Sequence, residues 1–180
     1  ALAVELAEAM TGWLREPVNF EEHEFFLECG LGVAVFPQHG ADAETLLSRA
    51  AAARDDAMVA GQGVCPVYSE EVGARSRERL ALDVELRRAV RNEELELHFQ
   101  PKICLASGKL AGVEALLRWY HSERGDVSPA TFIPLAEESG LILEIDAWVI
   151  RAACRQLRNW RDAGLATSIA VNVSGKHFAL

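Results

Sequence analysis

Hydrophobic residues in the first part of the chain recur at helical spacing and then at strand spacing. Together with the turn residues between them, they predict four elements: a helix over 2–14, a strand over 25–36, a helix over 43–60 and a short edge strand over 64–68. Asp42 is expected to cap the second helix, which Gly61 and Gly63 would end. The apolar face of each helix is expected to pack inward, and for the second helix that face comprises Leu46, Leu47, Ala50, Ala53, Ala57 and Met58.

The middle of the chain changes from apolar patterning to charge. Residues 70–78 are charged and rich in small side chains, and they are expected to form a linker. The next stretch, 80–90, fits both a strand and a helix by its spacing, and its density of Glu, Arg, Leu and Ala favours a helix that connects two domains. We therefore predict one domain over 1–69 and a second over 79–180.

The second part of the chain alternates strands with helices. The pattern predicts, in order, a strand over 95–101, a strand over 113–119, a helical stretch that opens at Ser128-Pro129 and is kinked or restarted at Pro134, a helix over 144–163, and a strand over 167–173. The arginines of the long helix are expected to face solvent; they are Arg151, Arg155, Arg158 and Arg161. This alternation predicts a parallel sheet and therefore an α/β fold.

The composition narrows the classes of protein. With 180 residues, 50% of them hydrophobic, the chain can bury the core of one domain of common size or of two small ones. The formal net charge of -9 argues against a general binder of nucleic-acid backbones, because such proteins carry a basic stripe. No apolar run approaches the roughly 18 residues of a membrane-spanning helix and no signal peptide is recognisable, so we expect a cytoplasmic protein.

The cysteines and histidines show none of the spacings that are typical of metal or redox sites. The four cysteines are scattered in apolar or strand-like surroundings and are expected to be buried free thiols; they are Cys29, Cys65, Cys104 and Cys154. The five histidines lack a pattern such as HxxxH; they are His23, His39, His98, His121 and His177. A histidine-based metal site is therefore not expected.

Two charged residues, Glu114 and Arg118, interrupt the apolar run over 113–119. Charges in a mostly buried strand need partners, usually a metal ion or an anionic ligand. A structural ion pair between Glu114 and Arg118 explains the same pattern from the residues alone. The neighbouring strand is expected to bring Gln100 into the region of Glu114.

The segment that contains Gln100-Pro101 and Glu114-Ala115-Leu116-Leu117-Arg118-Trp119 resembles the start of an EAL domain, the cyclic-di-GMP phosphodiesterase family. Further blocks follow in that family's order and spacing, over 132–142, 148–150 and 171–174. The resemblance covers 79–180 and implies the first strands and helices of a modified TIM barrel. Because a complete barrel needs around 250 residues, we expect an incomplete one, and this segment alone is expected to be inactive or nearly so.

The resemblance also implies roles for individual residues. Glu114 would be a catalytic, metal-binding carboxylate, and Asn172 would supply an amide oxygen to the same Mg²⁺ or Mn²⁺. Arg118 would meet a ligand phosphate, while Gln100 and Leu116 would touch the bound dinucleotide. Without the resemblance, Gln100 is simply a turn residue, Leu116 belongs to the core, and Asn172 bonds to neighbouring backbone. Asp146 is expected to cap the helix that begins near Glu144.

Residues 1–69 resemble the C-terminal part of a GGDEF domain, the diguanylate cyclase family, and this resemblance implies a partial α+β domain. The matching blocks are 32–37 and 42–47, whereas the signature loop is not in this chain, so synthesis of cyclic-di-GMP is not expected. Asp55 and Met58 stand where that family has a tyrosine and a phosphate-contacting lysine. Loss of that cation indicates a degenerate, regulatory or structural domain.

The expected function is hydrolysis of cyclic-di-GMP to linear pGpG by a metal-activated water. Cyclic-di-GMP is then the partner, and the resemblance also admits a homodimer through the EAL domain. A catalytically inactive cyclic-di-GMP receptor within a regulatory GGDEF-EAL protein is the alternative, and a purely structural interaction module is the third.

Overall fold

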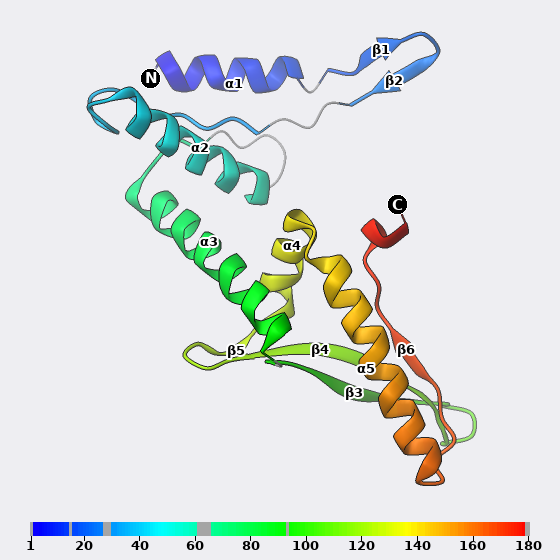
Figure 1. Ribbon diagram of the computed structural model, residues 1–180. Coiled ribbons are helices and arrows are strands. Elements are labelled where there is room, and N and C mark those ends of the chain that lie inside the picture. Colours follow the sequence, from blue (N-terminus) through cyan, green and yellow to red (C-terminus); the bar gives the residue numbers. More distant parts are fainter. Residues whose placement is uncertain (1, 15, 27–29, 61–65, 93, 179–180) are drawn as a thin grey trace. The chain divides into compact units, whose positions relative to one another are not determined.

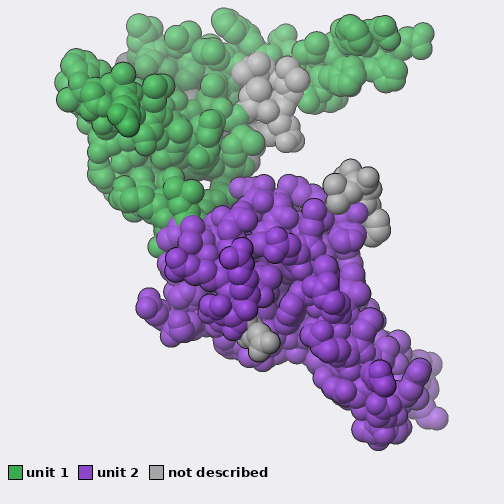
Figure 2. Space-filling view, in the orientation of Figure 1, with its two compact units in different colours: residues 1–80 green, residues 81–180 purple. Residues whose placement is uncertain are grey.

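The computed structural model describes residues 2–14, 16–26, 30–60, 66–92 and 94–178. The chain divides into two compact units, Ala1–Leu80 and Ala81–Leu180 (Figure 1; Figure 2). Gly61, Gly63, Cys29 and Cys65 lie outside the described residues.

The first unit holds two helices and a hairpin in its described part, followed by the start of a third helix. These elements are α1 (Leu2–Leu14), β1 (Val18–Phe20), β2 (His23–Phe25) and α2 (Ala43–Ala60). The predictions of α1 and α2 are confirmed, whereas the antiparallel hairpin β1–β2 was not expected. Asp42 caps α2 as predicted, because its Oδ1 accepts a hydrogen bond from the Thr45 N–H at 2.8 Å. This bond and a second one from the Thr45 hydroxyl hold the pKa of Asp42 below its ordinary value.

Apolar side chains of the first unit are more exposed than their spacing predicts. Expected core residues that lie exposed are Leu2, Leu6, Met10 and Trp13 of α1 and Leu47 and Met58 of α2. The described part of the predicted strands over 25–36 and 64–68 contains the end of β2 and a single parallel bridge between Val33 and Val67. The first strand is therefore much shorter than predicted, and residues 64 and 65 of the second lie outside the described residues. Spacing predicts which side of an element is apolar, but burial and strand pairing also need a partner surface.

Residues 70–78, expected as a linker, are the first turns of the long helix α3 (Glu70–Arg91). Acidic residues in its first turn and basic residues in its last turn interact favourably with the helix dipole and stabilise the helix. Val72 is buried near the start of α3, with Tyr68 and Ala53, while Leu80 is exposed. The prediction of a helix over 80–90 is confirmed. The prediction of a linker over 70–78 is wrong, because its charged residues lie on a helix and not in an irregular segment.

The second unit is built on a four-stranded sheet. Its strands are β3 (Leu95–Ile103), β4 (Leu110–His121), β5 (Gly125–Val127) and β6 (Ile169–Val171). β4 pairs antiparallel with β3 and β5, and parallel with β6. The predicted parallel sheet is therefore confirmed for β4 and β6, which helices connect, and is wrong for β3 and β5. Short turns connect β3 to β4 and β4 to β5, and only antiparallel strands can be joined in this way.

Helices α4 (Pro129–Ser139) and α5 (Ile142–Asp162) form the crossover between β4 and β6, and a short 3₁₀ helix, η1 (Gly175–Phe178), follows β6. In Figure 1, α5 lies across the sheet. Trp119 of β4 is fully buried, and its ring packs edge-on against Phe132 of α4, with 5.7 Å between the ring centroids. The ring centroids of Phe99 of β3 and Trp160 of α5 lie 4.9 Å apart. One face of the sheet therefore forms the core, and the other carries the polar residues discussed below.

The two predicted helices of this unit are confirmed. α4 runs through Pro134 as one helix, and the four arginines expected to face solvent on α5 are exposed. Cys104 and Cys154 are free but exposed, so their predicted burial is wrong: Cys104 follows the end of β3, and Cys154 lies on the outer side of α5. In the described ranges, none of the helices combines the length and the apolar character needed to cross a membrane.

Candidate functional site

The alternation of β3 and β4 places the predicted site residues on the sheet face opposite the core. The register pairs Gln100 with Glu114, as expected, and Leu116 and Arg118 follow on the same side because side chains of a strand alternate with a period of two. Gln100 lies within β3 and is not a turn residue. The parallel register pairs Glu114 with Ala170, two residues before Asn172. The fold therefore delivers Asn172 beside Glu114.

Glu114 is the centre of this polar face. Its Oε1 accepts a hydrogen bond from Asn172 Nδ2 at 3.0 Å, and its Oε2 lies 3.1 Å from Lys102 Nζ. The Asn172 amide, and then the Lys102 ammonium group, hold the pKa of Glu114 below its ordinary value. The site therefore presents an ionised carboxylate at neutral pH, and its side chain is 30% exposed.

Lys102 is a site residue that the sequence reasoning missed, and the alternative of a Glu114–Arg118 ion pair is wrong. Four positions along one strand separate those two residues by about 13 Å. Arg118 Nη1 instead donates a hydrogen bond to the Leu117 carbonyl oxygen at 2.8 Å. The signal for Lys102 was its place two residues after Gln100, which puts both on one strand face once β3 extends through Pro101.

A cavity of about 290 Å³ lies next to this polar face. Its apolar lining comes from the core side of the sheet and from helices α4 and α5, and includes Ala115, Leu117, Ile133, Ile142, Ile145 and Val149. Its polar and predicted lining residues are Leu116, Arg118, Glu137, Asp146, Asn172 and Ser174. Leu116 and Arg118 are half-buried there, so Leu116 is not sealed within the core. Three of the five predicted site residues therefore share one cavity, and Glu114 adjoins it through its bond to Asn172.

Asp146 has a role other than the expected helix cap. It lies in the second turn of α5, is only 3% exposed, and its Oδ2 accepts the Ser174 N–H at 3.1 Å. Glu137 of α4 accepts the Ser174 hydroxyl at 2.7 Å. The sequence reasoning did not single out Glu137 or Ser174. Asp146 is an acidic residue next to Ile145, which belongs to the apolar stripe of α5, and this position could have indicated its burial.

The donors for a metal are limited in this chain. The residues described by the structure include no group of three or more His, Cys, Asp or Glu side chains that could hold a metal ion. Glu114 and Asn172 nevertheless bring a carboxylate and an amide together, and both can offer the oxygen ligands that Mg²⁺ and Mn²⁺ prefer.

The sheet of the second unit and its flanking helices match a known protein family. The family described as "EAL domain" matches residues 83–179. The chain belongs to the EAL domain family. The resemblance of the second part of the chain to this family is thereby confirmed.

Named relatives extend the EAL comparison. The chain is 39% identical to the bifunctional diguanylate cyclase/cyclic di-GMP phosphodiesterase MucR of Pseudomonas aeruginosa, over 98% of this chain and 26% of MucR. It is 40% identical to the cyclic di-GMP phosphodiesterase PdeR of Escherichia coli, over 92% of this chain and 25% of PdeR. The chain therefore spans about a quarter of the length of these curated relatives.

A solved EAL structure confirms the α/β architecture. It is described as a PaMucR phosphodiesterase in complex with c-di-GMP, and it superposes with a TM-score of 0.52 at 48% identity. The likeness covers 57% of this chain and 40% of that one.

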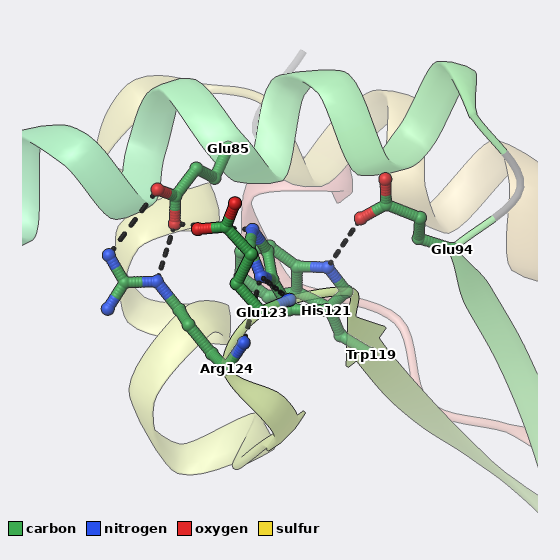
Figure 3. Close-up of polar contacts among 6 residues, drawn as sticks. All are labelled: Glu85, Glu94, Trp119, His121, Glu123 and Arg124. Carbon is green, nitrogen blue, oxygen red and sulfur yellow. Dashed lines mark hydrogen bonds and ion pairs between the residues drawn. The ribbon is translucent and has the colours of Figure 1, made fainter.

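The second unit, Ala81–Leu180, is called the EAL unit from here on. A second polar cluster in it joins α3 to the β4–β5 hairpin (Figure 3). The Arg124 guanidinium donates to both carboxylate oxygens of Glu85, at 2.7 and 3.4 Å, and lowers the pKa of Glu85. His121 Nδ1 accepts the backbone N–H groups of Glu123 and Arg124, so its Nε2 carries the proton and faces Glu85 at 3.5 Å. Each of these partners is supplied by the fold itself, which indicates a structural role.

Proposed function

We propose that this chain contributes to a phosphodiesterase that hydrolyses cyclic-di-GMP to linear pGpG. The observation that carries this proposal is the meeting of Glu114 and Asn172 at 3.0 Å beside the cavity lined by Arg118. The names of the relatives MucR and PdeR, and the c-di-GMP complex of the PaMucR structure, support the substrate.

Glu114 and Asn172 would hold a divalent cation, Mg²⁺ or Mn²⁺. Such a cation polarises phosphoryl oxygens and lowers the pKa of water, which makes hydrolysis of a phosphodiester feasible near neutral pH. Asn172 now presents Nδ2 to Glu114, and a half-turn of its amide would present Oδ1 instead. Two donors are part of the six that Mg²⁺ prefers, so water and residues of the complete protein would supply the others.

Arg118, Leu116 and Gln100 would bind the dinucleotide. The planar guanidinium of Arg118 suits a phosphate, and its half-buried position beside the cavity lowers the cost of fixing it. Leu116 offers an apolar surface in the same cavity. Gln100, opposite Glu114 in the register, would contact the part of the ligand that extends along β3.

Residues 1–69, within the first unit, are proposed to be the C-terminal part of a degenerate GGDEF domain with a regulatory role. The alignment with MucR supports this, because it covers 98% of the chain and MucR is named as a bifunctional diguanylate cyclase/phosphodiesterase. Asp55 and Met58, at the positions of the expected tyrosine and lysine, are both exposed on α2.

A second candidate is a receptor that binds cyclic-di-GMP without hydrolysing it. One observation favours it: the two oxygens of Glu114 are engaged by Lys102 and Asn172, so its charge is compensated within the chain itself.

Hydrolysis and ligand binding, measured together in the complete protein, separate the two candidates. For the enzyme, Glu114→Ala abolishes Mg²⁺- or Mn²⁺-dependent hydrolysis while the fold is retained, and Glu144→Ala, at an exposed glutamate in the first turn of α5, leaves hydrolysis unchanged. Unchanged turnover by Glu114→Ala would contradict the proposed mechanism. Binding of cyclic-di-GMP by the wild type without any hydrolysis would establish the receptor.

A further inference from the structure

The chain that follows β6 is anchored at Ser174. Its N–H donates to Asp146 Oδ2 at 3.1 Å, and its hydroxyl donates to Glu137 Oε1 at 2.7 Å. The same hydroxyl oxygen accepts the Lys176 N–H at 3.3 Å. Backbone and side chain of this one serine are therefore bound to two different helices, α4 and α5.

The two carboxylates make this anchor strong. Asp146 is 3% exposed, and a buried carboxylate is stable only when hydrogen-bond donors or positive groups surround it. Hydrogen bonds to an ionised acceptor are roughly twice as strong as those between neutral groups. Lys176 adds a contact from its Nζ to the Glu137 carbonyl oxygen, and His177 Nδ1 lies 3.8 Å from Asp146 Oδ2.

Asn172 precedes this anchor by two residues and follows the last residue of β6, Val171. An extended dipeptide spans only about 7 Å, so a fixed Ser174 limits where the Asn172 side chain can lie. Asn172 itself is exposed, and its Nδ2 bond to Glu114 at 3.0 Å is made from a short stretch of irregular backbone. β6 holds that stretch on one side and Ser174 on the other.

We propose that Ser174, held by Glu137 and Asp146, is a positioning residue that sets the Asn172 amide against Glu114. This inference rests on the proposed function, which assigns Glu114 and Asn172 to one divalent cation. Ser174 acts through Asn172 and has no ligand role of its own. The two acids of the cavity then serve to fix a metal ligand.

The first test is calorimetric titration of the complete protein with Mn²⁺ alone. Ser174→Ala is expected to weaken Mn²⁺ binding about tenfold, the size of effect seen when a residue that orients a metal ligand is lost. Ser174→Thr keeps the hydroxyl and restores the affinity, and Glu137→Gln weakens binding in the same direction but by less. Ser139→Ala is the matched control, since the Ser139 hydroxyl bonds only to Leu135 O within α4 among the contacts described, and it leaves Mn²⁺ binding unchanged.

The second test is a double-mutant cycle. If Ser174 acts through Asn172, then Ser174→Ala causes no further loss of Mn²⁺ affinity in an Asn172→Ala background. An equal tenfold loss in both backgrounds would overturn the inference, and so would a lowered thermal midpoint with wild-type Mn²⁺ affinity. If Ser174→Ala keeps wild-type Mn²⁺ affinity but Glu114→Ala loses Mn²⁺ binding, the proposed function stands without the role of Ser174. A wild-type protein that binds no Mn²⁺ would overturn both the proposed function and this inference.

Discussion

The glutamates Glu85 and Glu114 of the EAL unit each meet a cation, and they differ in how easily their partners can be exchanged. The guanidinium of Arg124 donates hydrogen bonds to both carboxylate oxygens of Glu85 (Figure 3). His121 lies beside Glu85, and two backbone N–H groups donate to its ring and hold it in place. Glu114 meets a single lysine amine and an amide that can turn over, beside a cavity.

The difference shows that a charged pair is not by itself a functional signal. Both glutamates have a lowered pKa, and in both a hydrogen bond from a neighbouring side chain is the largest cause. What separates them is that the Glu85 cluster joins α3 to a hairpin, whereas one partner of Glu114, Asn172, lines a cavity. Exchangeable partners and adjoining volume, rather than charge, therefore mark the candidate site.

The largest expected effect comes from making the same change in each cluster. Glu114→Gln is expected to lower the rate of cyclic-di-GMP hydrolysis by the complete protein about a hundredfold or more, because an amide replaces the charged metal ligand. Glu85→Gln is expected to leave that rate within about twofold of wild type, since neither Glu85 nor its partners Arg124 and His121 line the cavity, whereas Asn172, the partner of Glu114, does. Steady-state hydrolysis of both variants measures the contrast, and equal losses would dissolve the distinction between the clusters.

Lys102→Met sharpens the account of the exchangeable partner. Removing the Lys102 ammonium group, which lies 3.1 Å from Glu114 Oε2, takes away a competitor for the charge of this carboxylate. We expect Mn²⁺ to bind about fivefold more tightly, as measured by calorimetry. Lys109→Met, at an exposed lysine in the turn before β4, is the control and leaves affinity unchanged. Weaker binding by Lys102→Met would mean that the lysine assists the site.

Arg124→Ala tests the structural cluster. Both side chains of the Glu85–Arg124 pair are about a quarter to a third exposed, so we expect a loss of about 0.5–1 kcal/mol in the free energy of unfolding and no change in Mn²⁺ affinity. Denaturant unfolding measures the first quantity and calorimetry the second. Altered metal binding would show that the two clusters are coupled.

The smallest effect is a dependence on pH. Because Arg124 lowers the pKa of Glu85 below its ordinary 4.5, this pair stabilises the fold fully above that value, and the contribution is lost as pH falls through the lowered pKa. The stability difference between wild type and Arg124→Ala should therefore be constant at neutral pH and shrink as the pH falls below the ordinary pKa of 4.5. A difference that grows on acidification would contradict this assignment.

The sequence alone could predict the side of the sheet on which the candidate site lies, but only part of its membership. Alternation in β3 and β4 sufficed to bring Gln100 to Glu114, since the side-chain period of two is a property of the strand itself. Lys102 was missed because Pro101 suggested an early end to β3. Asp146 was mistaken for a cap because the start of α5 was placed two residues late.

The fold shows the same limit. The long helices were predictable because their apolar spacing and end residues are local signals, as at Asp42 and in α5. The exposure of Trp13 on α1 and the antiparallel pairing of β3 with β4 were not, because both depend on which surface or strand lies opposite. The charges at the start of α3 misled for the same reason, because the burial of Val72 depends on contacts with Tyr68 and Ala53, which lie outside α3.

The most direct test is a crystal structure of the complete protein with Mn²⁺, in which anomalous scattering locates the metal. The account predicts one ion bound by a Glu114 carboxylate oxygen and Asn172 Oδ1 at distances of about 2.1 Å, with the Asn172 amide turned and Lys102 moved off Glu114. Manganese bound elsewhere, with Asn172 Nδ2 and Lys102 Nζ still on Glu114, would contradict it.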